Sequence, residues 1–177
     1  VPYEPPKTSG KPAAKGEKRI LYTPGFDAIF IPSRASDVAL LATQLAFHDI
    51  KAPLLGTNGW NSPDFLRTAD RTADGAVFVD GFFVDSPNAN VQEFVQRYHK
   101  RYPGTPTLFT MQGYDAARVV LEAVRHGAGS GEAVRTFLAT QQDLPTLKGP
   151  ASFGPDGTLQ RPLFLLQVKQ GKFIPLN

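Results

Sequence analysis

The residues best suited to chemistry lie in a turn that follows a short apolar run, Pro53–Leu55. This turn, Gly56–Pro63, offers a hydroxyl, two carboxamides, flexible glycine backbone and the only tryptophan of the chain. Such groups bind a small polar solute through hydrogen bonds and ring contacts. If the apolar run is a strand of a parallel sheet, the turn lies at its carboxyl end, where open α/β sheets bind ligands. We therefore predict a ligand-facing turn; the alternative is a connecting turn whose tryptophan only packs.

Two further segments could contact the same ligand. Ser33 and Arg34 follow another predicted strand end and should lie beside the turn, where Arg34 could meet a carboxylate or stay solvated. Phe109 and Tyr114 flank the start of a predicted long helix, and each could face a cleft or a core. The predicted ligand-binding residues are Ser33, Arg34, Thr57, Asn58, Gly59, Trp60, Phe109 and Tyr114.

The sequence gives no support for catalysis, a metal site or a bound cofactor. It has no cysteine, which excludes disulfides, thiolate metal sites and cysteine nucleophiles. His48, His99 and His126 each fall near the end of a predicted helix, where an imidazole interacts with the helix dipole. The glycines of residues 127–131 follow a helix rather than a strand, so they connect helices instead of cradling a phosphate. We expect neither an enzyme, nor a metal, nor a cofactor.

Three aspartates surround the strand predicted at 76–83 and could form a group of carboxylates. Asp74 precedes that strand, Asp80 lies within it and Asp85 follows it in a turn. Aspartates in turns commonly cap helices or remain solvated, so we expect that role rather than acid–base catalysis.

The composition is that of an ordinary globular domain, because 41% of the 177 residues are hydrophobic and 20% are charged. No apolar run is long enough to span a bilayer, and we expect no second complete domain. The net charge of +3 comes from residues 1–19, which hold five basic and two acidic residues, while the remainder balances at zero. This segment lacks a hydrophobic period and is rich in Pro and Lys, so we predict a flexible linker. A neutral folded part argues against nucleic-acid binding.

Beyond the linker, apolar runs alternate with helical periods. Continuous or alternating apolar runs predict strands at 28–31, 53–55, 76–83, 150–153, 163–168 and 173–176. Apolar residues with helical spacing predict helices at about 36–48, 63–69, 87–102, 110–126 and 132–141. This order predicts an α/β fold with a mostly parallel sheet and a C-terminal β-hairpin.

Two helix starts have clear capping signals. Ser62 can accept hydrogen bonds from free N–H groups, Pro63 suits the first helical position, and Asp64 favours the positive end of the helix dipole. Ser86-Pro87 repeats this pattern and predicts the start of the next helix.

Five segments, in order, carry a resemblance to a known family. They are FDAIFIP, APLLGTNGWNSPDF, GAVFVDGFF, QGYDAARVVLEAV and SFGPDGTLQRPLFLLQVKQGKF, spanning about Gly25 to Leu176. The YDAA helix at Tyr114–Ala117 and the FGPDG turn at Phe153–Gly157 carry much of it. The chain resembles the type I periplasmic binding proteins, in the leucine-binding branch of ABC transporter substrate-binding proteins.

The resemblance implies two Rossmann-like lobes of three-layer αβα architecture, joined by three hinge strands and closing around a small solute. Residues 20–177 would then be a partial domain: the second lobe without its opening strand and helix, with C-terminal segments of the hinge and first lobe. The missing N-terminal lobe would be a partner of this part. The numbering begins at Val1 without an initiator Met, so we expect a fragment or a processed product.

The resemblance places the family's ligand-facing positions near Arg34, Asn58 and Phe109. Amino-acid binders of this branch have an aromatic, an acidic and an aromatic residue there, so Phe109 fits in type while the other two depart. Without a carboxylate at Asn58, a charge-assisted hydrogen bond of about 1.5–3 kcal/mol to a substrate ammonium is lost, or about tenfold or more in affinity. The implied ligand is an amino acid or a small carboxylate.

The implied function is non-catalytic capture of an extracytoplasmic solute for an ABC-type uptake system, by closure of two lobes. The alternative is a regulatory lipoprotein like those that activate penicillin-binding proteins, which are similar in fold but act by protein contact. Solute uptake implies a membrane permease as partner, and the regulatory interpretation implies a cell-wall synthase. Both imply a periplasmic or extracytoplasmic location, with a membrane anchor possible through a missing N-terminal part.

Overall fold

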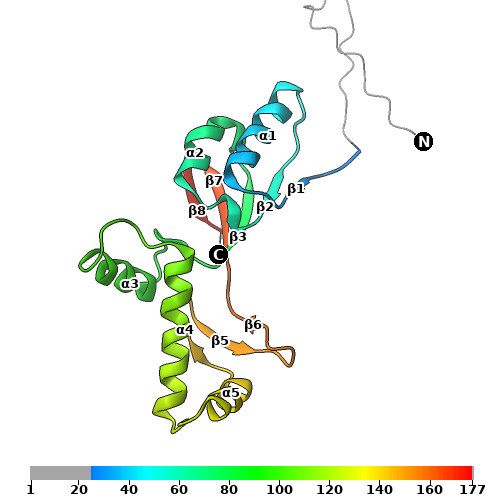
Figure 1. Ribbon diagram of the computed structural model, residues 1–177. Coiled ribbons are helices and arrows are strands. Elements are labelled where there is room, and N and C mark those ends of the chain that lie inside the picture. The colour runs from blue at the N-terminus through cyan, green and yellow to red at the C-terminus, as the bar shows by residue number, and fades with distance from the viewer. Residues whose placement is uncertain (1–24, 177) are drawn as a thin grey trace, which may run out of the picture.

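A computed structural model describes residues 25–176, which form two bodies joined at a narrow junction (Figure 1). The linker predicted at 1–19 lies outside the described residues. The first body, here called the sheet body, contains a five-stranded sheet in the order β1 (Ile29–Ile31), β2 (Leu54–Gly56), β3 (Val77–Asp80), β7 (Phe164–Lys169) and β8 (Lys172–Pro175). The first three strands are parallel, and β7 and β8 join them antiparallel. The mixed α/β class is as expected, with the parallel part confined to three strands.

Helices cover one face of this sheet: α1 (Ala35–Phe47), α2 (Pro63–Ala69) and the short 3-10 turns η1 (Asn58–Trp60) and η2 (Asp70–Ala73). Strand residues alternate between the two faces, and those facing the helices are buried. The core formed there includes Ile31, Val38, Ala42, Leu54, Trp60, Phe65, Phe78, Leu166 and Val168. Burial of apolar side chains on one face therefore fixes the register of the strands.

The opposite face of the sheet is uncovered in the described residues. Phe30, Leu55 and Val79, which alternate with the buried strand residues, are 61%, 38% and 39% exposed. Residues 25–176 thus supply two of the three layers of the lobe expected from the sequence.

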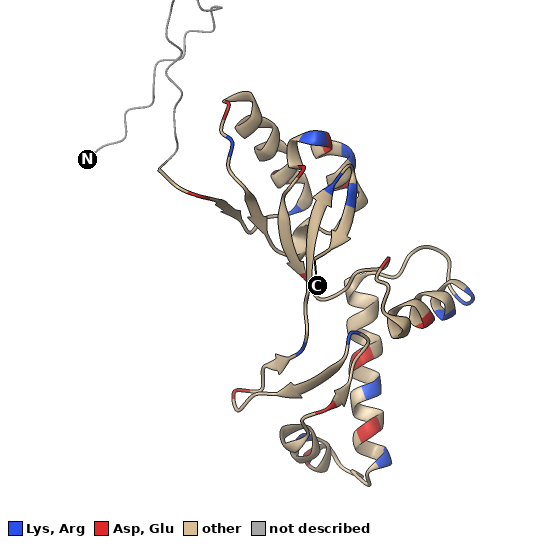
Figure 2. Cartoon of the chain, turned by 180° about the vertical axis from the view of Figure 1, so that it is seen from behind, with Lys and Arg blue, Asp and Glu red and all other residues tan. Residues whose placement is uncertain are grey.

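The second body, here called the helical body, consists of α3 (Ala89–His99), α4 (Leu108–Arg125), α5 (Gly131–Thr140) and a small antiparallel sheet. The strands of that sheet are β4 (Leu144–Pro145), β5 (Pro150–Phe153) and β6 (Leu159–Gln160). The chain crosses to this body after β3 and returns before β7, and β8 brings the C-terminal end back to the junction (Figure 1). Basic and acidic residues are interspersed along α4 (Figure 2).

Helix α4 is apolar on two faces, and only one of them is covered. Met111 and Ala123 lie on the covered face and are at most 1% exposed. On the other face Val120, Leu121 and Val124 are 45%, 54% and 53% exposed, and they belong to the apolar stripe that the sequence predicts.

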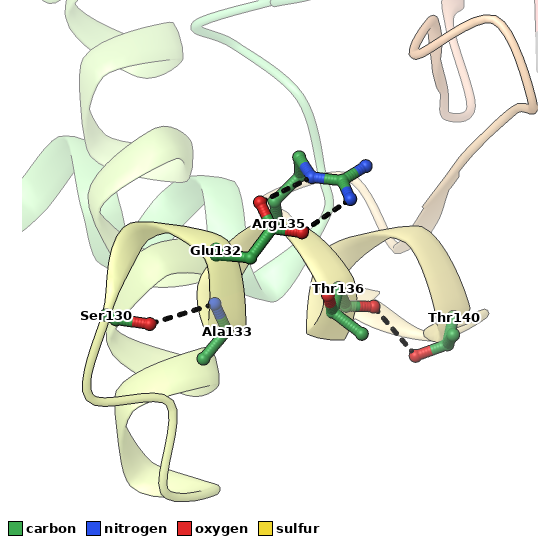
Figure 3. Close-up of polar contacts among 6 residues, drawn as sticks. All are labelled: Ser130, Glu132, Ala133, Arg135, Thr136 and Thr140. Atoms are coloured by element: carbon green, nitrogen blue, oxygen red, sulfur yellow. Dashed lines mark hydrogen bonds and ion pairs between the residues drawn. The ribbon is translucent and has the colours of Figure 1, made fainter.

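Helix α5 is stabilised by local contacts rather than by burial, since none of its residues is buried. Ser130 Oγ accepts a hydrogen bond from the Ala133 amide at 3.2 Å and caps the helix (Figure 3). Glu132 accepts two hydrogen bonds from Arg135, at 2.6 and 3.0 Å.

One of the two predicted helix starts is confirmed and the other is wrong. Ser62 Oγ accepts the Asp64 amide at 3.2 Å, with Pro63 at the first position of α2. Helix α3 instead begins after Asn88, whose Oδ1 accepts the amides of Asn90 and Val91, while Ser86 Oγ accepts the amide of Asn88, before the helix starts. Pro87 therefore lies in the connecting segment rather than in the helix.

Candidate functional site

The predicted turn and the segment Ser33–Arg34 lie side by side, as the sequence predicts. Strands β1 and β2 are parallel neighbours, so their carboxyl ends meet. A Cβ atom placed on Gly59 would stand 2.6 Å from the Ser33 carbonyl oxygen. Any side chain at position 59 would push the two strand ends apart, so the glycine allows the turn to close onto its neighbour.

Trp60 is the part of the turn that faces inward. Its exposed fraction is 0%, and its Nε1 donates a hydrogen bond to the Ile31 carbonyl oxygen at 3.1 Å. The indole packs against Phe65 and Phe78, with ring centroids 5.5 and 6.0 Å away. The ring has no surface left for a solute in this conformation, and the accessible part of the turn is residues 57–59, which are exposed or half-buried.

Ser33 and Arg34 stand at the start of α1. The Ser33 hydroxyl donates to Asp37 Oδ2 at 2.9 Å, so it is already engaged. Arg34 is the exposed N-cap residue of α1 and makes no side-chain cap. Of this pair, Arg34 is therefore the one open to a solute beside the turn.

The two predicted aromatic residues of α4 have different surroundings. Phe109, in the first turn of the helix, is 80% exposed. Tyr114 is half-buried, with its ring centroid 4.8 Å from that of Phe94 on α3 and the Arg118 guanidinium 5.6 Å above it. Tyr114 therefore ties α3 to α4, while Phe109 remains open.

A hollow of about 250 Å³ lies at the junction of the two bodies. It is lined by Asn58, Val79, Asp80, Gly81, Leu108, Gln112, Arg161 and Leu163. These residues come from the turn, the end of β3, the first turns of α4 and the segment before β7. Of the predicted ligand-binding residues, only Asn58 lines the hollow, and the structure brings it together with groups from the other body.

Asp80, at the end of β3, is a buried carboxylate whose two oxygens are both engaged. Oδ2 accepts from Asn61 Nδ2 at 2.7 Å, and Oδ1 accepts from the Phe82 amide at 3.1 Å. Burial raises the pKa of Asp80 above its ordinary value, and these hydrogen bonds and the charge of Arg161 oppose the rise. Asp80 thus fixes the strand end that forms one wall of the hollow.

The three aspartates around β3 do not form a group. Asp74 lies before the strand and its Oδ1 accepts the Gln170 amide at 3.0 Å, whereas Asp80 closes the opposite end. Asp85 is exposed beyond that end. Structural hydrogen bonds account for Asp74 and Asp80, as expected for aspartates near turns.

Arg161 and Asp115 form a largely buried ion pair that sequence reasoning missed. Arg161 Nη1 lies 3.7 Å from Asp115 Oδ2, and the two side chains are 15% and 6% exposed. Asp115 Oδ1 accepts the Leu147 amide at 3.0 Å, while Oδ2 has no hydrogen-bond partner. Burial raises the pKa of Asp115, against the Leu147 hydrogen bond and the charges of Arg161 and Arg118. No local pattern links residues so far apart, so only the fold reveals the pair.

The three histidines lie at helix ends, as the sequence predicts. His48 and His126 are the C-cap residues of α1 and α4, and His99 is the last residue of α3. Within residues 25–176, no group of three His, Cys, Asp or Glu side chains is placed to hold a metal ion. In the same part of the chain, no helix combines the length and the apolar character needed to cross a membrane.

Comparison with known proteins identifies the family. A family profile described as periplasmic binding protein matches residues 23–172, which is most of the chain. The chain belongs to the periplasmic binding protein family. The likeness to solved structures supports the type I class within it, and the two bodies described above are parts of that fold.

Three solved structures illustrate the likeness of this periplasmic binding protein to others. A Rhodospirillum rubrum protein assigned to branched-chain amino acid ABC transport has a TM-score of 0.78 and 28% identity, over 85% of this chain and 44% of its own. An extracellular ligand-binding receptor from Rhodopseudomonas palustris has a TM-score of 0.66 and 28% identity, over 85% and 48%. LivJ from Streptococcus pneumoniae, a branched-chain amino acid transporter substrate-binding protein in complex with isoleucine, has a TM-score of 0.66 and 25% identity, over 85% and 43%.

The chain spans less than half the length of these three proteins. No curated protein sequence gives a significant match to it.

Proposed function

We propose that the protein is a non-catalytic solute receptor of an ABC-type uptake system, outside the cytoplasm, with its ligand held in a cleft between two lobes. Membership of the periplasmic binding protein family supports a solute-binding role and an extracytoplasmic location. The similarity to LivJ and to the Rhodospirillum rubrum protein supports the link to ABC transport.

The observation that carries this proposal is the hollow at the junction. Its walls come from Asn58 and β3 on the sheet body and from Leu108 and Gln112 on the helical body. A solute bound there would touch both bodies, so closure of the bodies about the junction would strengthen its contacts. The remaining part of the cleft would come from the lobe that residues 25–176 do not contain.

The ligand on this proposal is an amino acid or a small carboxylate. Asn58 is exposed at the rim and offers a neutral carboxamide, which can both donate and accept hydrogen bonds. Arg34 supplies a positive charge beside the turn, and the exposed ring of Phe109 supplies an apolar surface. Thr57 and Gly59 add a hydroxyl and backbone groups next to Asn58.

Calorimetry and thermal unfolding of the intact protein with a panel of amino acids, small carboxylates and aromatic acids test the proposal. A ligand present at a hundredfold excess over its Kd should stabilise the protein by about 2.7 kcal/mol. Asn58→Ala should weaken binding by about 0.5–1.5 kcal/mol, the net value of one hydrogen bond. Asn90→Ala, at an exposed position of α3, is the matched control and should leave the affinity unchanged.

The absence of any thermal shift across the panel, together with specific binding to a penicillin-binding cell-wall synthase, would overturn solute capture. That result would favour the regulatory lipoprotein. A catalysed change in any panel compound would show that the protein is an enzyme instead.

A further inference from the structure

Arg161 is the charged residue of the hollow whose position bears on the chemical class of the ligand. Arg161 lies between β6 and β7, where the chain returns from the helical body to the sheet body, and its side chain is one wall of the hollow. A Cβ on Gly81 would stand 2.3 Å from Arg161 Nη2, so the guanidinium rests directly against the backbone that follows β3. Its position is therefore set by both bodies, which limits the orientational freedom a ligand would have to remove.

The guanidinium has more donors than partners. Arginine carries five N–H donors and no acceptor. Within residues 25–176 its polar contacts are the Met111 sulfur, 3.3 Å from Nη1, and the Asp115 carboxylate, 3.7 Å from the same nitrogen. A thioether is a weak acceptor, and 3.7 Å is too long for a hydrogen bond. A mostly buried positive charge thus lies at a hollow without a carboxylate at hydrogen-bond distance.

The neighbouring carboxylates attract the guanidinium by charge, but they expose almost no surface to a solute. Asp80 and Asp115 are 2% and 4% exposed, and both Asp80 oxygens already accept hydrogen bonds. The exposed polar groups that line the hollow are the carboxamides of Asn58 and Gln112. Both amides can donate to a carboxylate, although they can also accept hydrogen bonds. The preference against a cation comes instead from charge: Arg161 is positive, and no exposed carboxylate is among the residues that line the hollow.

We propose that Arg161 binds a carboxylate of the ligand, and that the solute class is therefore small organic acids in which an ammonium group is not required. This inference rests on the proposed function. A planar guanidinium can donate two parallel N–H···O bonds to a carboxylate, and within residues 25–176 neither Nε nor Nη2 of Arg161 donates a hydrogen bond. Val79, Leu108 and Leu163 provide the apolar wall for the carbon skeleton of the acid.

Matched probes separate charge from shape: 4-methylpentanoate against 4-methylpentanamide, benzoate against benzamide, and leucine as the ammonium-bearing comparison. Their affinities for the intact protein are measured by calorimetry. We expect at least one acid to bind at least about tenfold more tightly than its amide, the effect of one charge-assisted hydrogen bond. Arg161→Gln should remove this preference, whereas Arg97→Gln, on the exposed face of α3, should retain it.

Gly81→Ala keeps the charge but displaces the guanidinium, because the new Cβ would overlap Nη2. It should also lower the affinity for acids, and circular dichroism of both variants checks that they fold. Amides that bind as tightly as acids, or an Arg161→Gln variant that folds and retains the preference for acids, would overturn the inference while leaving solute capture standing. No binding by any probe or by the wider panel would count against the proposed function itself.

Discussion

In the sheet body, α1 and α2 cover one face of the sheet and bury Trp60 and Phe65. In the helical body, by contrast, the apolar stripe of α4 faces solvent, and no residue of α5 is buried. Both bodies are well ordered locally, with capped helices and paired strands. The difference lies in the core. A contiguous core fills one side of the sheet body and extends across the junction to Val91, Phe94, Met111 and Leu147. Farther along the helical body only small or scattered apolar residues are buried: Val119, Ala123, Ala128, Leu144 and Ala151.

This comparison shows that well-formed helices do not require a complete core. The exposed α4 stripe and the uncovered sheet face are both apolar, and surfaces of that kind usually pack against further protein. They agree with a chain that spans less than half the length of its structural relatives. Because side chains are more deeply buried in the sheet body, the same type of substitution should change the free energy of unfolding differently in the two bodies.

The largest effect is expected for loss of an aromatic side chain. Trp60→Ala should lower the free energy of unfolding of the chain by about 3–5 kcal/mol, since loss of the fully buried indole leaves a cavity and the Ile31 carbonyl loses one of its two donors, keeping the Ser33 amide. Phe109→Ala, at an 80% exposed position of α4, should stay within about 0.5 kcal/mol. Urea unfolding of both variants measures the difference, and equal losses would break the comparison.

Replacement of glycine by alanine should have opposite signs in the two bodies. A Cβ on Gly56 would stand 2.2 Å from the Trp60 ring, so Gly56→Ala overpacks the core and should cost about 1–3 kcal/mol. Gly113 in α4 has no atom within 4 Å of its Cβ position, so Gly113→Ala should stabilise the helix by about 0.5–1 kcal/mol. Thermal unfolding midpoints that shift in the same direction for both would contradict this prediction.

A smaller, local effect is expected at the start of α5. Ser130→Ala removes the hydrogen bond to the Ala133 amide and should destabilise the helix by about 1 kcal/mol. Because α5 buries no residue, the loss should remain local. Amide hydrogen exchange should accelerate in 131–140 and stay unchanged in β3; acceleration in both would mean that the bodies unfold together.

The smallest effect concerns the pH dependence at the junction. Burial raises the pKa of Asp115 in the folded state, so its contribution to stability is fully present below the unfolded pKa and is lost as pH rises through the folded one. Asp115→Asn removes this titration, and the carboxamide oxygen of the asparagine can still accept the hydrogen bond from the Leu147 amide. The stability of the variant relative to wild type should therefore increase from pH 4 to pH 7 in urea titrations, and a decrease would show that the ion pair with Arg161 outweighs burial.

The sequence predicted local features well where one physical rule decides them. The cap at Ser62, the helix of α4 and the strand Pro150–Phe153 follow from side-chain type and period, and the structure confirms them. The start of α3 was predicted at Ser86 because Ser-Pro resembles a cap, but Asn88 caps the helix with two hydrogen bonds. Competing caps within three residues differ by too little for sequence alone to rank them.

Pairings between distant residues could not be predicted from the sequence. The strands β4 and β6 have two residues each, too few for a period, and exist because β5 lies between them. The site shows the same limit. The turn sequence identifies Asn58 as a site residue. Arg161 lines the hollow because the segment before β7 lies against Gly81, a contact between distant residues that no local pattern indicates. The predicted ligand-binding residues, apart from the buried ring of Trp60, remain predictions for the binding experiments.

The pairing of β3 with β7 has a consequence for how the protein is made. Val77 lies opposite Gln167, so the third strand emerges from the ribosome long before its antiparallel neighbour exists. Until then β3 is an edge, with N–H and C=O groups open to another chain. Contacts between residues so distant in sequence form slowly. Premature termination before residue 164 would leave that edge permanently open, and we expect such shortened chains to aggregate during synthesis rather than fold.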